Sequence, residues 1–172
     1  GFRETGSLVI TTEDDKEPLE KLMENGLRNG LTDLSIIGAE EIREIEPILT
    51  HDVKWALYCK GAGICSPYEM AIAMAENAIK NGATLELENE VLDIEKIEGG
   101  FKVKTNKGEY NSRYIVNAAG VYADKISRMV GVDNFEIFPR SGEYILFTRG
   151  TGEAINTVIF QLPTKLGKGV LL

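Results

Sequence analysis

Residues 116–120, with the sequence Val-Asn-Ala-Ala-Gly, could bring a ligand close to the backbone. The small side chains of Ala118, Ala119 and Gly120 leave room for a flat or anionic group. The segment follows an apolar stretch and precedes a predicted helix, and ligands collect at the carboxyl ends of strands in open α/β sheets. A tight strand-to-helix turn without a ligand explains the same residues equally well. The pattern alone therefore leaves Asn117–Gly120 a candidate.

Two basic segments could bind an anionic substrate. Arg140 lies beside Gly142 and Tyr144 in the sequence Pro-Arg-Ser-Gly-Glu-Tyr, and a guanidinium can hold a carboxylate or phosphate with two hydrogen bonds. Lys165 lies among glycines at residues 163–169, but this segment lacks the order of a phosphate-binding P-loop. A surface arginine beside a turn and an exposed hairpin loop are the simpler interpretations of the two segments.

Val91 is a weaker candidate, since it begins a predicted strand. The backbone of a strand can hydrogen-bond to the edge of an adenine, although most such valines only pack in a core.

Metal chemistry and histidine-dependent catalysis have little support in the sequence. His51 is the only histidine, Cys59 and Cys65 are the only cysteines, and their spacing is not that of a zinc site. A catalytic triad would depend entirely on His51, which lies in a polar turn where a solvated histidine is the simpler interpretation. The cysteines could pair across a hairpin, but we expect two buried free thiols.

The composition is that of a soluble, acidic globular protein. Hydrophobic residues make up 43% of the 172 residues and charged residues 27%, and the net charge is −8. An acidic chain without a basic stripe disfavours nucleic acid and anionic membrane surfaces as partners. No apolar run approaches the roughly 20 residues of a transmembrane helix. We expect a cytoplasmic location.

The elements that must position these residues follow from periodicity and from turn signals. Helices are predicted where apolar residues recur at helical spacing, and Ser66 and Pro67 give the strongest helix start. The predicted helices are 17–29, 39–45, 67–81 and 123–130, and the predicted strands are 7–12, 34–37, 53–59, 84–88, 91–97, 101–105, 108–110, 114–117, 143–148, 158–162 and 170 onward. Gly99-Gly100 predicts the turn of a hairpin.

Two patterns of predicted secondary structure alternate along the chain. Residues 63–131 have α/β character, whereas residues 1–62 and 132–172 are rich in predicted strands. We therefore expect an α+β fold in which the two flanks form one discontinuous lobe around an inserted α/β portion.

Four motifs occur in the order found in one known family. They closely resemble the D-amino-acid-oxidase-like FAD flavoproteins, and the nearest branch holds FAD-dependent glycerol-3-phosphate dehydrogenases and L-2-hydroxyglutarate oxidases. The motifs span nearly the whole chain: residues 63–69 (GICSPYE), 73–83 (AMAENAIKNGA), 114–124 (YIVNAAGVYAD) and 139–144 (PRSGEY).

The resemblance implies a truncated flavoprotein fold and FAD as the cofactor. In the family, a Gly-x-Gly-x-x-Gly unit holds the FAD pyrophosphate; no such motif occurs here, so we expect an internal fragment that does not hold FAD by itself. Residues 63–131 would form part of the FAD domain, with Val91 and Asn117–Gly120 along the dinucleotide. The flanks would form an antiparallel substrate lobe, in which Arg140, Tyr144 and Lys165 bind a small anionic substrate. No catalytic residue is implied.

The implied reaction is hydride transfer to flavin from glycerol 3-phosphate or a related 2-hydroxy acid. Two alternatives remain open: an amine oxidase of the glycine or sarcosine type within the same family, and a non-catalytic binding module that has lost the cofactor site. The parent protein could be peripheral to a membrane, and the fragment could self-associate through exposed apolar surface.

Overall fold

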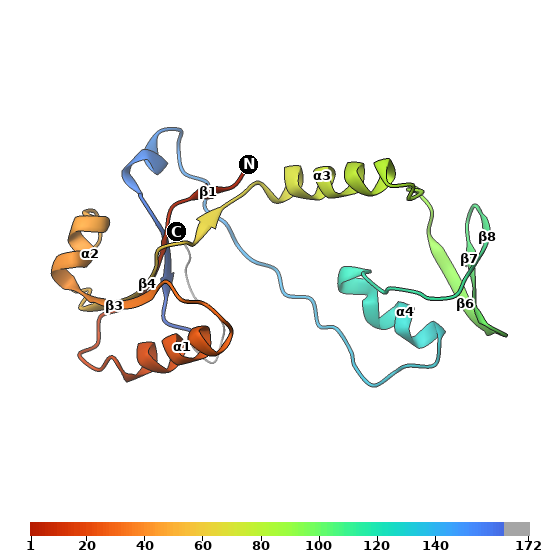
Figure 1. Cartoon of the computed structure of the whole chain (residues 1–172), viewed down its shortest axis with the longest axis horizontal. Helices are drawn as coiled ribbons and strands as arrows, with labels where there is room; N and C mark the ends of the chain where they lie inside the picture. Colours follow the sequence, from red (N-terminus) through yellow and green to blue (C-terminus); the bar gives the residue numbers. More distant parts are fainter. Residues whose placement is uncertain (164–172) are drawn as a thin grey trace. The chain divides into compact units, whose positions relative to one another are not determined.

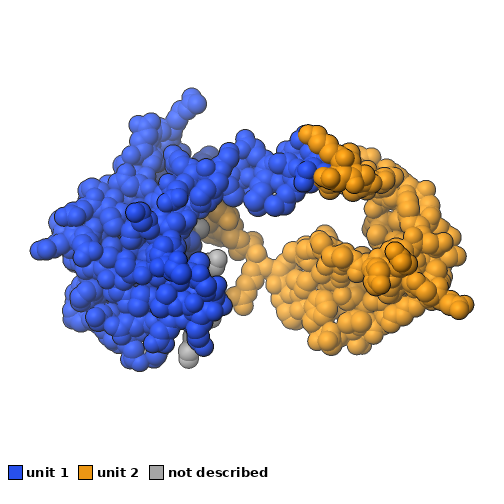
Figure 2. All heavy atoms as spheres, viewed as in Figure 1, with its two compact units in different colours: residues 1–77, 146–172 blue, residues 78–145 orange. Residues whose placement is uncertain are grey.

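The structure, a computed structural model, describes residues 1–163. These residues belong to two compact units (Figure 2). Unit 1 consists of residues 1–77 and the chain from residue 146 onward, and unit 2 consists of residues 78–145. Lys165, one of the predicted substrate ligands, and the strand predicted from residue 170 lie outside the described residues.

Unit 1 is built on a four-stranded sheet with the order β3-β4-β2-β9. Figure 1 labels β3 and β4 of this sheet. The β2–β4 and β3–β4 pairs are antiparallel, and β9 joins the free edge of β2 in parallel. A separate two-stranded ribbon pairs β1 with β5. The elements of the sheet and ribbon are β1 (Arg3–Glu4), β2 (Ser7–Thr11), β3 (Leu34–Gly38), β4 (Trp55–Cys59), β5 (Gly63–Ile64) and β9 (Val158–Gln161).

Two helices cover opposite faces of this sheet. α2 (Ala39–Ile45) buries Ile42 with Leu8 and Ala56 in the core. α1 (Glu17–Arg28) contacts β3 and β4, and its Gly26 meets the side chain of Leu34. Because Leu34 and Ile37 point to opposite faces of β3, the two helices enclose the sheet from both sides.

Helix α3 (Pro67–Lys80) begins as the sequence predicts. The backbone N–H of Glu69 donates to the Ser66 hydroxyl at 3.3 Å, and Pro67 occupies the first turn. None of the residues of this helix is buried, although its sequence contains apolar residues at helical spacing.

Unit 2 contains an antiparallel sheet with the order β6-β7-β8. The predicted hairpin is confirmed, because β6 (Val91–Ile97) and β7 (Gly100–Thr105) are joined by a tight turn that contains Gly99 at φ +78°. β8 (Gly108–Ser112) completes the sheet. A short 3₁₀ turn, η1 (Gly120–Tyr122), leads into α4 (Ala123–Met129), which packs against β6.

Three predicted strands are wrong. Residues 84–88, 114–117 and 143–148 form no strand in the structure. Their apolar composition suits a sheet, but a strand needs a neighbour for its backbone hydrogen bonds, and none pairs with them within residues 1–163. Tyr114 and Val116, expected in a buried strand, are 80% and 90% exposed.

The sequence-based interpretations of the cysteines and histidine are partly confirmed. Cys59 and Cys65 are free, but Cys59, at the end of β4, is only half-buried, and Cys65, which follows the two-residue strand β5, is exposed. His51 is exposed in a turn, as expected. Among residues 1–163 no cluster of three or more potential metal ligands occurs. Within the same range, no helix has the length and apolar character needed to cross a membrane.

Candidate functional site

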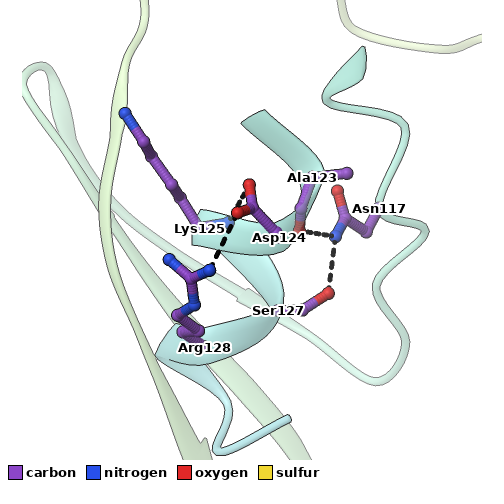
Figure 3. Close-up of polar contacts among 6 residues, drawn as sticks. All are labelled: Asn117, Ala123, Asp124, Lys125, Ser127 and Arg128. Carbon is purple, nitrogen blue, oxygen red and sulfur yellow. Dashed lines mark hydrogen bonds and ion pairs between the residues drawn. The ribbon is translucent and has the colours of Figure 1, made fainter. Parts of the chain in front are cut away.

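The loop that precedes α4 is held in shape by Asn117. Its side-chain amide donates to the carbonyl of Ala123 at 2.8 Å and to the hydroxyl of Ser127 at 3.0 Å (Figure 3). Its oxygen accepts the backbone N–H of Ala119 at 3.3 Å. One side chain thus ties both ends of the loop to the helix that follows.

The loop has small side chains, and the space around Gly120 is open. Gly120 has φ +56°, a left-handed conformation that favours glycine, and a Cβ added there would meet nothing within 4 Å. The N–H of Tyr122 donates to the carbonyl of Ala119 at 3.0 Å, which closes the 3₁₀ turn. At Gly120, therefore, no side chain within 4 Å blocks the approach of a flat group or a phosphate to the backbone.

A buried acid anchors the helix behind the loop. Asp124 is 6% exposed; it accepts from Arg128 at 2.9 Å and from the N–H of Lys125 at 2.9 Å (Figure 3). The ammonium of Lys125 lies 4.9 Å from the centre of the Tyr122 ring. These contacts fix the first turn of α4, and the loop that precedes the helix therefore ends at a fixed position. This pair is not among the residues singled out from the sequence, although the Asp-x-x-x-Arg spacing is a local signal for it.

The start of β6 is pinned by an asparagine on the neighbouring turn. The N–H of Glu90 donates to Asn106 Oδ1 at 2.8 Å, and the N–H of Asn106 donates to the Glu90 carbonyl at 3.1 Å. The register with β7 shifts between Val91 and Asp93, the sign of a β-bulge. Val91 therefore lies at a fixed but irregular strand start, in the same unit as Asn117–Gly120.

The predicted substrate ligands are not gathered into a pocket. Arg140 and Tyr144 lie on a segment without regular structure, and the Tyr144 side chain is 93% exposed. The structure brings neither of them into contact with the Asn117–Gly120 loop by any hydrogen bond among residues 1–163. Their role in substrate binding stays a prediction.

A second buried carboxylate lies in unit 1. Glu46, at the end of α2, is fully buried, and its Oε2 accepts the N–H groups of Asn156 at 2.8 Å and Thr157 at 3.0 Å. The Thr157 hydroxyl donates to the same oxygen at 3.3 Å. Since its partners lie 110 and 111 residues away, no local pattern could have found this contact.

Comparison with known proteins identifies the family. The model of a family described as FAD dependent oxidoreductase matches residues 1–171. The chain belongs to this family of FAD-dependent oxidoreductases. The expected family and its FAD cofactor are thereby confirmed.

Relatives in this family include dehydrogenases of two hydroxyl-bearing acids. The chain is 47% identical over 172 residues to the glycerol 3-phosphate dehydrogenase of Caloramator mitchellensis, covering 99% of this chain and 36% of the relative. It is 30% identical over 176 residues to the mitochondrial L-2-hydroxyglutarate dehydrogenase of Mus musculus, covering 94% of this chain and 38% of the relative. The chain thus spans little more than a third of these relatives.

Solved structures confirm the fold. The L-α-glycerophosphate oxidase of Mycoplasma pneumoniae, solved with FAD bound, aligns with a TM-score of 0.78 and 24% identity over 99% of this chain and 46% of that chain. Glycine oxidases align similarly at 22% identity. At these identities the likeness shows the fold alone, a truncated flavoprotein fold with mixed helices and sheets.

The residues present fit one side of a dinucleotide. The open Asn117–Gly120 loop offers unobstructed backbone to a flat or anionic group, and unit 2 holds Val91 at a pinned strand start. Within residues 1–163 no Gly-x-Gly-x-x-Gly segment is present to hold a pyrophosphate. The assignment of these residues to a cofactor site stays a prediction.

Proposed function

We propose that this chain is part of an FAD-dependent dehydrogenase that oxidises glycerol 3-phosphate. The observation that carries the proposal is the 47% identity, over essentially the full chain, to a glycerol 3-phosphate dehydrogenase. A related 2-hydroxy acid is the second substrate class, which the 30% identity to an L-2-hydroxyglutarate dehydrogenase favours less strongly. Both substrates carry a hydroxyl on the oxidised carbon and an anionic group.

In this proposal unit 2 supplies a wall of the cofactor site. Asn117 fixes the loop, and the backbone of Ala118–Gly120 lies along the dinucleotide, where small side chains admit it closely. Val91 would present its backbone to the adenine edge. The bound flavin would accept the hydride from the substrate carbon. The chain's own residues would bind and orient the cofactor and the substrate.

Substrate charge would be met by basic residues of the chain. Arg140 and Lys165 are the proposed ligands of the phosphate or carboxylate, and Tyr144 is a further proposed hydrogen-bond donor. Arg140 is exposed and in no ion pair within residues 1–163, so its guanidinium is free to meet an anion.

Steady-state assays of the polypeptide that contains this chain test the proposal. With an artificial electron acceptor, glycerol 3-phosphate should give the highest kcat/KM, ahead of L-2-hydroxyglutarate, and glycine and sarcosine should give none. Higher kcat/KM with glycine or sarcosine would replace the proposal with the amine-oxidase alternative. Turnover of none of the four by a flavin-free polypeptide would favour the binding-module alternative.

A further inference from the structure

The chain just before β6 is held at several points by the turn between β7 and β8. Asn106 in this turn accepts the N–H of Glu90 on its Oδ1 at 2.8 Å, and its own backbone N–H donates to the Glu90 carbonyl at 3.1 Å. Its Nδ2 donates to the carbonyl of Glu88 at 3.2 Å. The ammonium of Lys107 donates to the carbonyl of Leu87 at 2.6 Å. Two adjacent turn residues thus hold the segment that leads into β6.

The backbone of this segment has an unusual conformation. Glu88 has φ +52°, in the left-handed region, and it is the only non-glycine residue with a positive φ among residues 1–163. A residue with a long side chain does not favour this conformation by itself, and it persists where neighbouring contacts impose it. The hydrogen bonds from Asn106 Nδ2 and Lys107 Nζ to backbone carbonyls of the segment are such contacts. The turn therefore sets the path of the chain into β6.

The contacts of Glu90 decide the direction of the backbone groups of the next residue. Both the N–H and the C=O of Glu90 are directed toward Asn106, on the β7 side. Successive residues of an extended strand turn these groups to opposite sides, so the N–H and C=O of Val91 are directed away from β7. Within residues 1–163, β7 is the only strand that pairs with β6. The two backbone groups of Val91 therefore face the free edge of this sheet.

A donor and an acceptor on one residue match the edge of an adenine. Adenine carries an amino donor beside a ring-nitrogen acceptor, so a backbone N–H can donate to the ring nitrogen while the C=O accepts from the amino group. A 6-oxopurine, such as hypoxanthine or guanine, carries an acceptor oxygen in place of that amino group. The Val91 carbonyl would then face a second acceptor, which disfavours binding of the 6-oxopurine.

We propose that Asn106 is a positioning residue for the nucleobase of the bound dinucleotide. By holding Glu90, it directs the N–H and C=O of Val91 to the free edge, where they select adenine over a 6-oxopurine. Asn106 itself does not touch the base. The inference rests on the proposed function in placing Val91 at the adenine of FAD, and it adds the residue that sets the orientation and the selectivity of that contact.

Nucleotide binding to the polypeptide that contains this chain, prepared without flavin, tests the role of Asn106. Isothermal titration with ADP and with inosine diphosphate, its 6-oxo counterpart, gives two Kd values on one preparation. In the unsubstituted protein we expect the Kd of inosine diphosphate to exceed that of ADP at least about tenfold, the effect of one mismatched hydrogen bond. A general loss of folded protein lowers the binding stoichiometry but does not change the ratio of the two Kd values.

Substitutions of Asn106 should change this ratio. Asn106→Ala removes the acceptor of the Glu90 N–H and the donor to the Glu88 carbonyl. We expect it to weaken ADP binding and to lower the ratio to about threefold or less, because Val91 no longer holds one orientation. Asn106→Asp keeps an acceptor for the Glu90 N–H and should keep most of the ratio. Asn111→Ala, on an exposed asparagine of β8 in the same sheet, is the matched control and should leave the ratio unchanged.

Three results would overturn the proposal: no measurable binding of ADP or a ratio near one in the unsubstituted protein, a ratio that Asn106→Ala leaves unchanged, or a ratio in Asn106→Asp as low as that in Asn106→Ala. The first removes the selective contact with adenine, the second the role of Asn106, and the third the part played by the Glu90 N–H.

Reduction of bound flavin by glycerol 3-phosphate separates this inference from the proposed function. If the flavin is reduced but any of the three results is found, only the positioning role is lost and the proposed function stands. If the nucleotides bind with the expected ratios but neither glycerol 3-phosphate nor a 2-hydroxy acid reduces the flavin, the proposed function fails and the role of Asn106 stands.

Discussion

At the scale of single residues, Asn117 has a more definite part than its type suggests. An asparagine before Ala-Ala-Gly could equally have turned its amide toward a ligand, and the sequence could not decide this. In the structure both ends of the amide are used inside unit 2, by Ala119, Ala123 and Ser127. Asn117 therefore acts on the loop, and in the proposed function the backbone of the loop, not the Asn117 side chain, meets the cofactor.

Substituting Asn117 should loosen this loop. Asn117→Ala removes three hydrogen bonds, and because the side chain is exposed we expect a loss of only about 1 kcal/mol in the free energy of unfolding. Asn117→Asp keeps the acceptor but loses both donors, so its loss should be similar. Urea unfolding measures both. Asn134→Ala, on an exposed loop asparagine, is the control, and an equal loss there would contradict the assigned role.

Glu46 should matter more to stability, because it is fully buried and its partners are backbone groups. Glu46→Ala leaves the N–H groups of Asn156 and Thr157 without their acceptor, and we expect a loss of about 3 kcal/mol in the free energy of unfolding. Glu44→Ala, on the exposed side of the same helix, should cost less than about 0.5 kcal/mol. Similar losses from the two variants in urea unfolding would contradict this role of Glu46.

The two cysteines should react at different rates. Burial, and next the nearby negative charge of Asp33, raise the pKa of the Cys59 thiol above its ordinary value, so less of it is thiolate near neutral pH. Cys65 is exposed. Alkylation with iodoacetamide at pH 7.5, followed by mass spectrometry, should modify Cys65 first. Asp33→Asn should speed the reaction of Cys59, and an unchanged rate would show that the charge has no part.

At the scale of elements, local signals predicted the helices and the β6–β7 hairpin, whereas apolar composition alone predicted three strands that do not form. Helix 39–45 and the start of helix 67 were correct, because apolar periodicity and the Ser66-Pro67 cap are written in adjacent residues. Residues 84–88, 114–117 and 143–148 have the composition of strands but form none. A strand depends on its neighbours, and those neighbours are not encoded within the segment itself.

The same dependence on neighbours makes Gly100 the sensitive position in the β6–β8 sheet. A Cβ at Gly100 would collide with the backbone carbonyl of Ser112 on β8, which cannot move without disturbing the sheet. We expect Gly100→Ala to lower the melting temperature by at least about 5 °C, the shift that follows from a loss of about 1 kcal/mol in a domain of this size. Gly152→Ala, where a Cβ meets nothing, should change it little.

At the scale of the whole molecule, much apolar surface is exposed. Met70, Ile72 and Met74 on α3 are 47%, 60% and 63% exposed, and Tyr114 and Val116 are more so. Surface of this kind normally marks an interaction site. Because the chain spans 36% of a relative with which it shares 47% identity, we propose that further segments of a longer polypeptide cover it.

Because of this exposed apolar surface, the isolated chain should be prone to self-association. We also expect it to be colourless, since it has no Gly-x-Gly-x-x-Gly segment. Sedimentation velocity should show species larger than a monomer as the concentration rises, driven by the exposed apolar side chains of α3. Ile72→Lys with Met74→Lys should return it toward a monomer, because the added charges oppose burial. A strictly monomeric wild-type chain at high concentration would contradict this expectation. Stoichiometric flavin absorption would show that the chain holds FAD by itself.

The most direct test of the proposed function is anaerobic stopped-flow reduction of the polypeptide that contains this chain, purified with FAD. On mixing with glycerol 3-phosphate, we predict that the flavin absorption near 450 nm bleaches, with a rate that saturates in substrate. L-2-hydroxyglutarate should bleach it more slowly, and glycine should not. A polypeptide that holds FAD but is bleached by glycine, and not by glycerol 3-phosphate, would contradict the proposal.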